Sequence, residues 1–134
     1  MNVSGIIAVR IAANATAHAL LSNRVYPGKV KQEAGYPAVA VNLITPGPTN
    51  TKTGDSDIDI TLVQVDIYGS TYTSTANTAS AVRAALDYYS GTVSLTGGGS
   101  ANVASITYET EHDGFSDNAE LYRRIQEYYI SIRR

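Results

Sequence analysis

The sequence predicts an α+β fold, in which helices and strands combine around one core. Two kinds of periodicity support this class. Residues 58–68 alternate apolar and polar side chains as a β-strand does, whereas residues 3–21 and 72–89 repeat apolar side chains at the three- and four-residue spacing of a helix. The chain has 134 residues, which is enough for one hydrophobic core. We therefore expect a single domain over residues 1–134.

Composition narrows the possible functions before any motif is considered. The chain contains no cysteine, which excludes disulfides and thiolate zinc sites. Its formal charge is −2, whereas nucleic-acid binders usually carry a dense basic face. No apolar run approaches the ~20 residues that span a bilayer, and the N-terminus lacks the pattern of a signal peptide. We expect a soluble intracellular product that binds neither a membrane nor, as a direct ligand, nucleic acid.

The N-terminal half begins with one predicted helix over residues 3–21, which the Ser22-Asn23 pair is expected to end. Pro27 and Gly28 then interrupt a connector. Residues 38–44 alternate as a strand and lead into the central strand, residues 58–68.

The apolar side of the central strand changes part-way along it. Apolar side chains lie on one face up to Leu62 and on the opposite face from Val63 onward. Either a β-bulge at this point or burial of the strand on both faces explains the change.

The segment from Thr45 to Asp57 contains no large apolar side chain. Such long loops in a compact domain are usually functional or disordered. We expect this loop to be mobile in the free subunit and to recognise a partner. The alternative is a hairpin tip with no further role.

The C-terminal half contains one more helix and two or three strands. Residues 72–89 predict a helix with Thr73 or Ser74 as N-cap and Gly91 at its end. Strands are expected at 92–95 and 103–111, joined by a flexible glycine-rich turn. Residues 121–132 fit a helix and a strand equally well, so periodicity leaves this segment open.

The order of several short motifs resembles the tail-completion (tail terminator) proteins of long-tailed bacteriophages over nearly the whole chain. No single motif is chemically specific, so the resemblance depends on their order and spacing. The motifs are Arg24-Val-Tyr-Pro, Tyr36-Pro-Ala-Val-Ala-Val, Val63-Gln-Val-Asp-Ile-Tyr-Gly, Val82-Arg-Ala-Ala-Leu and Glu120-Leu-Tyr-Arg-Arg-Ile.

The resemblance implies a fold and a function. The fold is a mixed, mainly antiparallel sheet of about four to five strands, with two helices packed on one face and the last segment as a strand. The function is that of a structural virion protein, a hexameric ring that caps the tail tube, stops its growth and joins tail to head. The implied partners are the major tail tube protein and the head-tail connector (neck) protein, with DNA only passing through the lumen. The protein would lie at the head-proximal end of the tail, after assembly in the host cytoplasm.

Two alternative functions stay open from the sequence. One is a head-completion or neck protein, which is a close structural competitor. The other is a small-ligand-binding α+β domain, whose pocket the ten tyrosines could line.

We expect no enzyme, no cofactor and no metal site. Asp55, Asp57 and Asp59 have the spacing that opens a calcium loop, but the glycine and glutamate that complete such a loop are missing. His18 and His112 lie near no nucleophile motif.

Three further acids, Glu109, Glu111 and Asp113, are predicted to share one strand face. We expect these acids to form an ordinary exposed face of the strand. The alternative is that they bind a hard cation.

Two sets of surface residues are predicted to serve assembly. A strongly basic lining would hold DNA by counterion release, so acids are expected to face the ring lumen. The second set forms the interface between subunits, where its arginines would pair with acids of a neighbouring subunit. The alternative is that these arginines lie on a solvated strand edge. The interface set is Thr49, Asn50, Thr51, Lys52, Asp55, Arg123 and Arg124, and the lumen set is Asp55, Asp57, Glu109 and Glu111.

Overall fold

The computed structural model describes residues 3–22, 24–28, 35–45, 48–51, 54–95, 98–116 and 121–133. Its helices are α1 (Val3–Ala13), α2 (Ala15–Leu21) and α3 (Tyr72–Leu86). Its strands are β1 (Val25–Pro27), β2 (Ala38–Thr45), β3 (Pro48–Thr51), β4 (Gly54–Gly69), β5 (Gly91–Ser94), β6 (Ser100–Ser116) and β7 (Leu121–Arg133).

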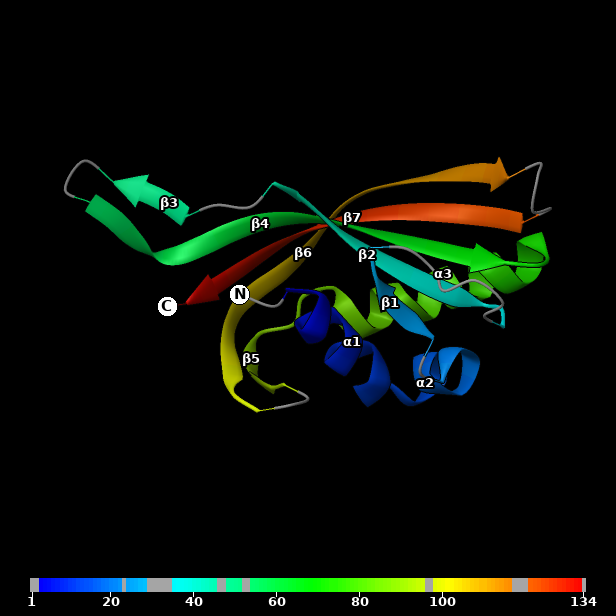
Figure 1. Ribbon diagram of the computed structural model, residues 1–134, viewed down its shortest axis with the longest axis horizontal. Helices are drawn as coiled ribbons and strands as arrows, with labels where there is room; N and C mark the ends of the chain where they lie inside the picture. Colours follow the sequence, from blue (N-terminus) through cyan, green and yellow to red (C-terminus); the bar gives the residue numbers. More distant parts are fainter. Residues whose placement is uncertain are drawn as a thin grey trace.

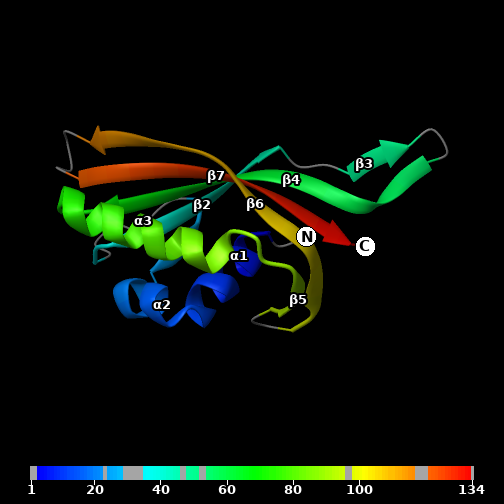
Figure 2. The ribbon, with the colours of Figure 1, turned by 180° about the vertical axis from the view of Figure 1, so that it is seen from behind.

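All three helices lie on one side of a curled sheet (Figures 1 and 2). Six of the seven strands run in the order β1-β2-β4-β7-β6-β5, and the seventh, β3, pairs with β4 beside this path. Every pair is antiparallel except β1 with β2, which is parallel. This arrangement confirms the α+β class and the mainly antiparallel sheet. The described residues form more elements than expected, because β1 and β3 are added strands and the first helix is divided.

The predicted helix over residues 3–21 is wrong as one unit, because α1 and α2 meet at Asn14 with a bend of 105°. The Asn14 side chain accepts a hydrogen bond from the backbone N–H of Ala17, 3.0 Å away, and so caps α2. Asparagine favours such local bonds over a helix interior. Ser22 ends α2 as its C-cap, as expected. Within the described residues no single helix is long and apolar enough to cross a membrane, although the bent α1–α2 pair together has that length and composition.

The core lies between the helices and one face of the sheet, which we call the covered face. Ile6, Ile7 and Ile11 of α1 are fully buried there. Gly69 ends β4 where α3 passes very close, since a Cβ atom at this position would clash with Thr75 Oγ1. The core residues that the strands contribute include Val39, Val41, Val63, Val65, Ile67, Val103, Ile106, Tyr128, Ile130 and Ile132.

The change of apolar side in β4 is not a bulge in that strand. The pairing of β4 with β7 runs without a shift from Ile58–Arg133 to Gly69–Tyr122. A register shift occurs instead in β2, between Leu43 and Thr45. From Val63 onward the apolar side chains of β4 therefore point to the core, whereas up to Leu62 they point to the other face, which no described helix covers. We call this other face the open face.

The C-terminal segment is strand β7, which lies between β4 and β6. This confirms what the resemblance implied and what periodicity left open. Tyr128, Ile130 and Ile132 contribute to the core, and the neighbouring strands take up the backbone hydrogen bonds on both edges of β7.

The ends of the second predicted helix differ from expectation. Thr71 is the N-cap of α3, since its hydroxyl accepts from the backbone N–H of Ser74 at 3.1 Å, so the prediction of Thr73 or Ser74 is wrong. Asp87 is the C-cap, and Gly91 begins β5 instead of ending the helix. Thr71 could take this place because its own backbone is extended, as an N-cap requires.

The segment from Thr45 to Asp57, which was expected to be a loop with a hairpin tip as the alternative, forms a β-hairpin over most of its length. Pro48–Thr51 forms β3, which pairs with the first part of β4 in the register Asn50–Asp55 and Thr51–Gly54. Hairpin pairing satisfies backbone groups even where side chains are polar. We call β3 with residues 54–57 the arm; Figure 1 shows it projecting beyond the helices. Lys52 lies outside the described residues.

Candidate interaction surfaces

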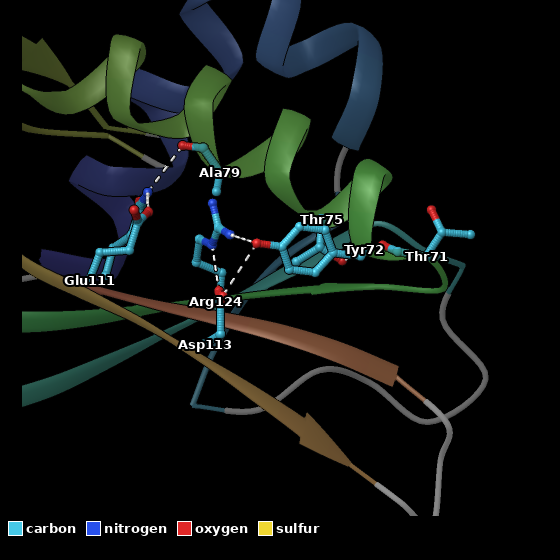
Figure 3. Close-up of polar contacts among 8 residues, drawn as sticks. Thr71, Tyr72, Thr75, Ala79, Glu111, Asp113 and Arg124 are labelled. Atoms are coloured by element: carbon cyan, nitrogen blue, oxygen red, sulfur yellow. Dashed lines mark hydrogen bonds and ion pairs between the residues drawn. The ribbon is translucent and has the colours of Figure 1, made fainter.

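A polar cluster fixes the start of α3 against β6 and β7 (Figure 3). The guanidinium of Arg124 donates from Nη2 to the Tyr72 hydroxyl at 3.0 Å and from Nε to Asp113 Oδ1 at 2.7 Å. The hydrogen bond to Asp113 raises the pKa of Arg124, so this pair stays ionised. The cluster holds the first turn of the helix over the ends of the two strands.

A second polar network lies deeper on the covered face, around Gln126. Its Nε2 donates to Glu111 Oε1 at 2.7 Å and to the Ala79 carbonyl at 3.1 Å, and its Oε1 accepts from the Tyr128 hydroxyl at 2.7 Å. Gln126 is 1% exposed. Its amide is thus bonded at both ends, which a buried polar group requires. Burial raises the pKa of Tyr128.

A mostly apolar cavity of about 340 Å³ opens where α3 begins beside the ends of β6 and β7. Tyr72 and Tyr122 meet edge to face with their ring centroids 6.0 Å apart, and they are 52% and 37% exposed. We call this the Tyr72–Tyr122 cavity. The residues that line it are Tyr72, Thr75, Asp113, Gly114, Tyr122 and Arg123.

The open face carries an ion pair between β4 and β7. The Asp66 carboxylate, whose side chain is only 4% exposed, lies 3.0 Å from Nη2 of Arg123. Gln64 donates to the same carboxylate at 2.8 Å. Both bonds help to offset the cost of burying the charge.

Beside this ion pair, towards the arm, the open face is apolar. Ile44, Ile60 and Tyr129 are 46%, 43% and 38% exposed, and Leu62 pairs directly with Tyr129 across β4 and β7. We call these four residues the apolar patch. They come from the three neighbouring strands β2, β4 and β7.

The comparisons with known proteins bear on the fold of the chain. No family model matches the chain, and no curated protein matches it. A chain of the virion of a native gene transfer agent (GTA) particle matches with a TM-score of 0.70 and 14% sequence identity, covering 98% of this chain and 95% of that chain. The two chains share a fold.

Only two of the three acids that were expected to share one strand face do so. A register shift in β6 between Tyr108 and Thr110 leaves Glu109 as an exposed, unpaired bulge residue. Glu111 and Asp113 both face the helices, where Gln126 and Arg124 bond them. The shared-face prediction is therefore wrong for Glu109 alone, because the bulge takes this residue out of the alternation of the strand. The described residues contain no group of three potential metal ligands.

The two predicted arginines are both bonded within the chain, to different partners on opposite faces. Arg123 pairs with Asp66 on the open face and Arg124 with Asp113 on the covered face. The other predicted interface and lumen residues fall on the arm. Thr49, Asn50 and Thr51 lie in β3, and Asp55 and Asp57 in β4, while the arrangement of their side chains lies outside what the structure describes.

The sequence analysis missed the Tyr72–Tyr122 cavity and the apolar patch. For the cavity no sequence signal existed, because its walls come from residues some 40 to 50 positions apart. The patch had one signal, the change of apolar side at Leu62. Once a bulge in β4 is excluded, that change indicates apolar residues on the open face.

Proposed function

We propose that this chain is a structural protein of a phage-like virion and that it caps the tail tube as a hexameric ring. The observation that carries this proposal is the similarity in fold, over nearly the full length of both chains, to a chain of a gene transfer agent virion particle. The tail-terminator resemblance of the motif order supports the same role. That resemblance is independent of the fold comparison, because it was drawn from the sequence alone.

In this role the ring stops growth of the tube and offers the surface that joins tail to head. Its partners are the major tail tube protein on one side and the neck protein on the other, and DNA passes through its lumen without a specific site. The protein lies at the head-proximal end of the tail and is assembled into it in the host cytoplasm. It performs no catalysis in this proposal. The most prominent polar groups are occupied instead in holding α3 on the sheet.

The arm is the part of the chain that we assign to the tail tube, through Thr49, Asn50, Thr51, Lys52 and Asp55. It projects from the body, and among the described residues its two strands pair with each other beyond the last β4–β7 pair, at Ile58 and Arg133. Because Arg123 and Arg124 are already paired within the chain, they have a smaller part in this contact.

The role is tested by electron microscopy of tails assembled with and without the protein. We expect tails of uniform length with a six-fold ring at the head-proximal end when it is present, and over-long tails that do not join heads when it is absent. Tails of normal length in its absence would contradict the proposal. Labelled protein found on tail-free heads would favour the head-completion alternative.

A further inference from the structure

We infer that the outer edge of β6, over residues 110–116, binds an extended basic segment of a partner protein as an added β-strand. The inference goes beyond the proposed function, because such an edge accepts a strand whether it faces the lumen of a ring or its outside. On one side β6 pairs with β7 as far as Ser116 and Leu121, whereas on the other side β5 reaches no further than Val103. Figures 1 and 2 show the last part of β6, in orange, as the border of the sheet.

The middle of β6 shows which backbone groups point away from β7. The N–H of Ile106 donates to the Tyr89 carbonyl at 3.0 Å, and its carbonyl accepts from the N–H of Tyr88 at 2.9 Å. The N–H of Tyr108 points the same way and donates to Asp87 Oδ1 at 3.2 Å. Residues of an antiparallel strand alternate between the two sides in this manner. Up to Tyr108, the outward groups of these residues therefore have partners at the end of α3.

Beyond Tyr108 the outward groups lose such partners. The bulge at Glu109 shifts the alternation by one residue, so the N–H and C=O groups of Glu111 and Asp113 point outward, while those of His112 point to β7. No strand among the described residues pairs with this edge. The border strands β1 and β5 are three and four residues long, and such short edges limit pairing with other chains. Residues 110–116 lack that protection, and unpaired backbone groups in a row are a template for another strand.

The charge of the edge selects the kind of partner. Glu109, Glu111 and Asp113 bring three carboxylates to this part of β6, and Arg124 pairs with that of Asp113. Glu111 accepts a hydrogen bond from the neutral amide of Gln126, and the exposed Glu109 has no hydrogen bond or ion pair within the described part of the chain. A second copy would bring the same acids to the contact, and like charges on paired strands are destabilising. A segment with Lys or Arg therefore fits this edge better.

The Tyr72–Tyr122 cavity gives the same edge a place for an apolar side chain. Asp113 and Gly114 of β6 line it from the sheet, and Tyr72 and Thr75 line it from α3. Side chains of a strand recur on one face at every second residue. A segment added along β6 thus turns alternate side chains to the covered face, where this mostly apolar cavity opens. In strand addition the main-chain hydrogen bonds supply affinity, and a cavity for alternate side chains supplies specificity.

Hydrogen exchange, measured for each amide by NMR, tests the edge in the natural chain. We expect the amides of Glu111 and Asp113 to exchange at least about tenfold faster than that of His112, which points to β7. The probe is a library of random peptides of about ten residues, which is longer than a typical strand. Selected peptides should share a Lys or Arg and a large apolar residue an even number of positions away. On binding, they should slow the Glu111 and Asp113 amides by at least about tenfold.

Two variants at one position separate the backbone from the side chain. Asp113→Pro and Asp113→Ala both lose the carboxylate, but Asp113→Pro also loses the outward N–H, a change that edge strands tolerate. The selected peptides should bind Asp113→Pro about tenfold more weakly than Asp113→Ala, because one main-chain hydrogen bond is missing. Glu109→Gln should weaken binding about threefold at low salt, since it removes an exposed charge. Thermal unfolding of each variant reports whether the fold is kept, and if Asp113→Pro fails to fold, the exchange measurement on the natural chain decides.

Three results would overturn the inference. One is a selection whose peptides lack the shared base or leave the Glu111 and Asp113 amides unprotected. Another is equal affinity of the selected peptides for folded Asp113→Pro and Asp113→Ala. The third is slow exchange of the two amides in the natural chain that becomes fast on dilution, which would show that a second copy covers the edge. None of these results bears on whether the protein caps tails, so the inference and the proposed function can fail separately.

Discussion

At the scale of single residues, the sheet depends on a few buried polar side chains whose partners come from distant parts of the sequence. Asp66 and Arg123 are 57 residues apart, and Gln126 reaches Ala79 across 47. Leaving such groups without partners costs about 1–3 kcal/mol each, so these contacts favour one register of β7 over its alternatives. The same contacts join β7 to α3 and β4.

The first prediction concerns Tyr128, whose pKa is raised mainly by burial. Below pH ~10 the tyrosine is protonated in the folded and unfolded chain, so it adds no pH dependence. Above that pH the unfolded chain loses the proton first, and the free energy of unfolding should fall by about 1.4 kcal/mol per pH unit. Tyr128→Phe should reduce this slope, measured by urea unfolding between pH 8 and 11.

The substitution also removes the hydrogen bond to Gln126, so at pH 8 it should lower the free energy of unfolding by about 1 kcal/mol. Tyr88→Phe is the control, since Tyr88 is 86% exposed and should leave the alkaline slope as it is in the natural chain. An equal slope in the Tyr128→Phe and Tyr88→Phe variants would show that burial of Tyr128 does not govern the alkaline loss of stability.

At the scale of elements, the long strand β4 has two halves with different surroundings. Its second half packs under the helices and pairs with β2 and β7 on its two edges. In the described part of the chain its first residues pair with β3, beyond the end of β7. Stability should therefore concentrate in the second half, because local stability follows buried apolar contact.

The second prediction is that the arm can be shortened without loss of the fold. Replacing residues Thr49–Gly54 by a two-residue turn should leave the midpoint of thermal unfolding nearly unchanged, since the shortened part lies beyond the last β4–β7 pair, at Ile58 and Arg133. Binding to purified tail tubes should be abolished. Co-sedimentation with tubes and calorimetry measure the two effects on the same sample.

A variant of equal length, with Thr49, Asn50 and Thr51 all replaced by serine, separates chemistry from length. It should keep the hairpin and lose part of the binding. If the shortened protein still bound tubes and stopped their growth at the usual length, the arm would be only a hairpin tip, and recognition would lie elsewhere.

At the scale of the whole molecule, the helices and the sheet give the subunit two unlike sides (Figure 2). In the proposed ring one side of each subunit must meet the lumen. The balance of charge, −2 for the chain, suits a lumen along which DNA slides without being held. The proposed lumen residues are Asp55, Asp57, Glu109 and Glu111.

The third prediction tests this lumen by reversing charge. Glu109→Lys together with Asp57→Lys should slow DNA ejection while leaving tail length unchanged, because added cations hold the phosphate backbone. Glu111 is left intact, since it accepts a hydrogen bond from the buried Gln126. Ejection is followed by release of dye-labelled DNA from purified particles.

Thr92→Lys is the matched control, because it adds positive charge to an exposed position on the edge strand β5. It should not alter ejection. If particles with Glu109→Lys and Asp57→Lys ejected DNA at the natural rate, these two acids would not face the lumen.

The sequence by itself determined the segments with a clear period. The strands at 38–44 and 58–68 and most of the helix at 72–89 were predicted close to their observed bounds. The change of apolar side at Leu62 was also visible, and it marks the apolar patch. The Asn14 cap also depends only on residues close in the sequence, but the regular apolar spacing around Asn14 concealed the break in the helix.

Only the tertiary structure decided the rest. Periodicity could not distinguish helix from strand over residues 121–133, and β7 is a strand because β4 and β6 pair with both of its edges. The shift at Glu109 could not be predicted either, since a bulge is defined by the partner strand. The Tyr72–Tyr122 cavity likewise exists only where α3 meets two strand ends. Periodicity is a property of one segment, whereas pairing, bulges and cavities depend on segments that lie far apart in the chain.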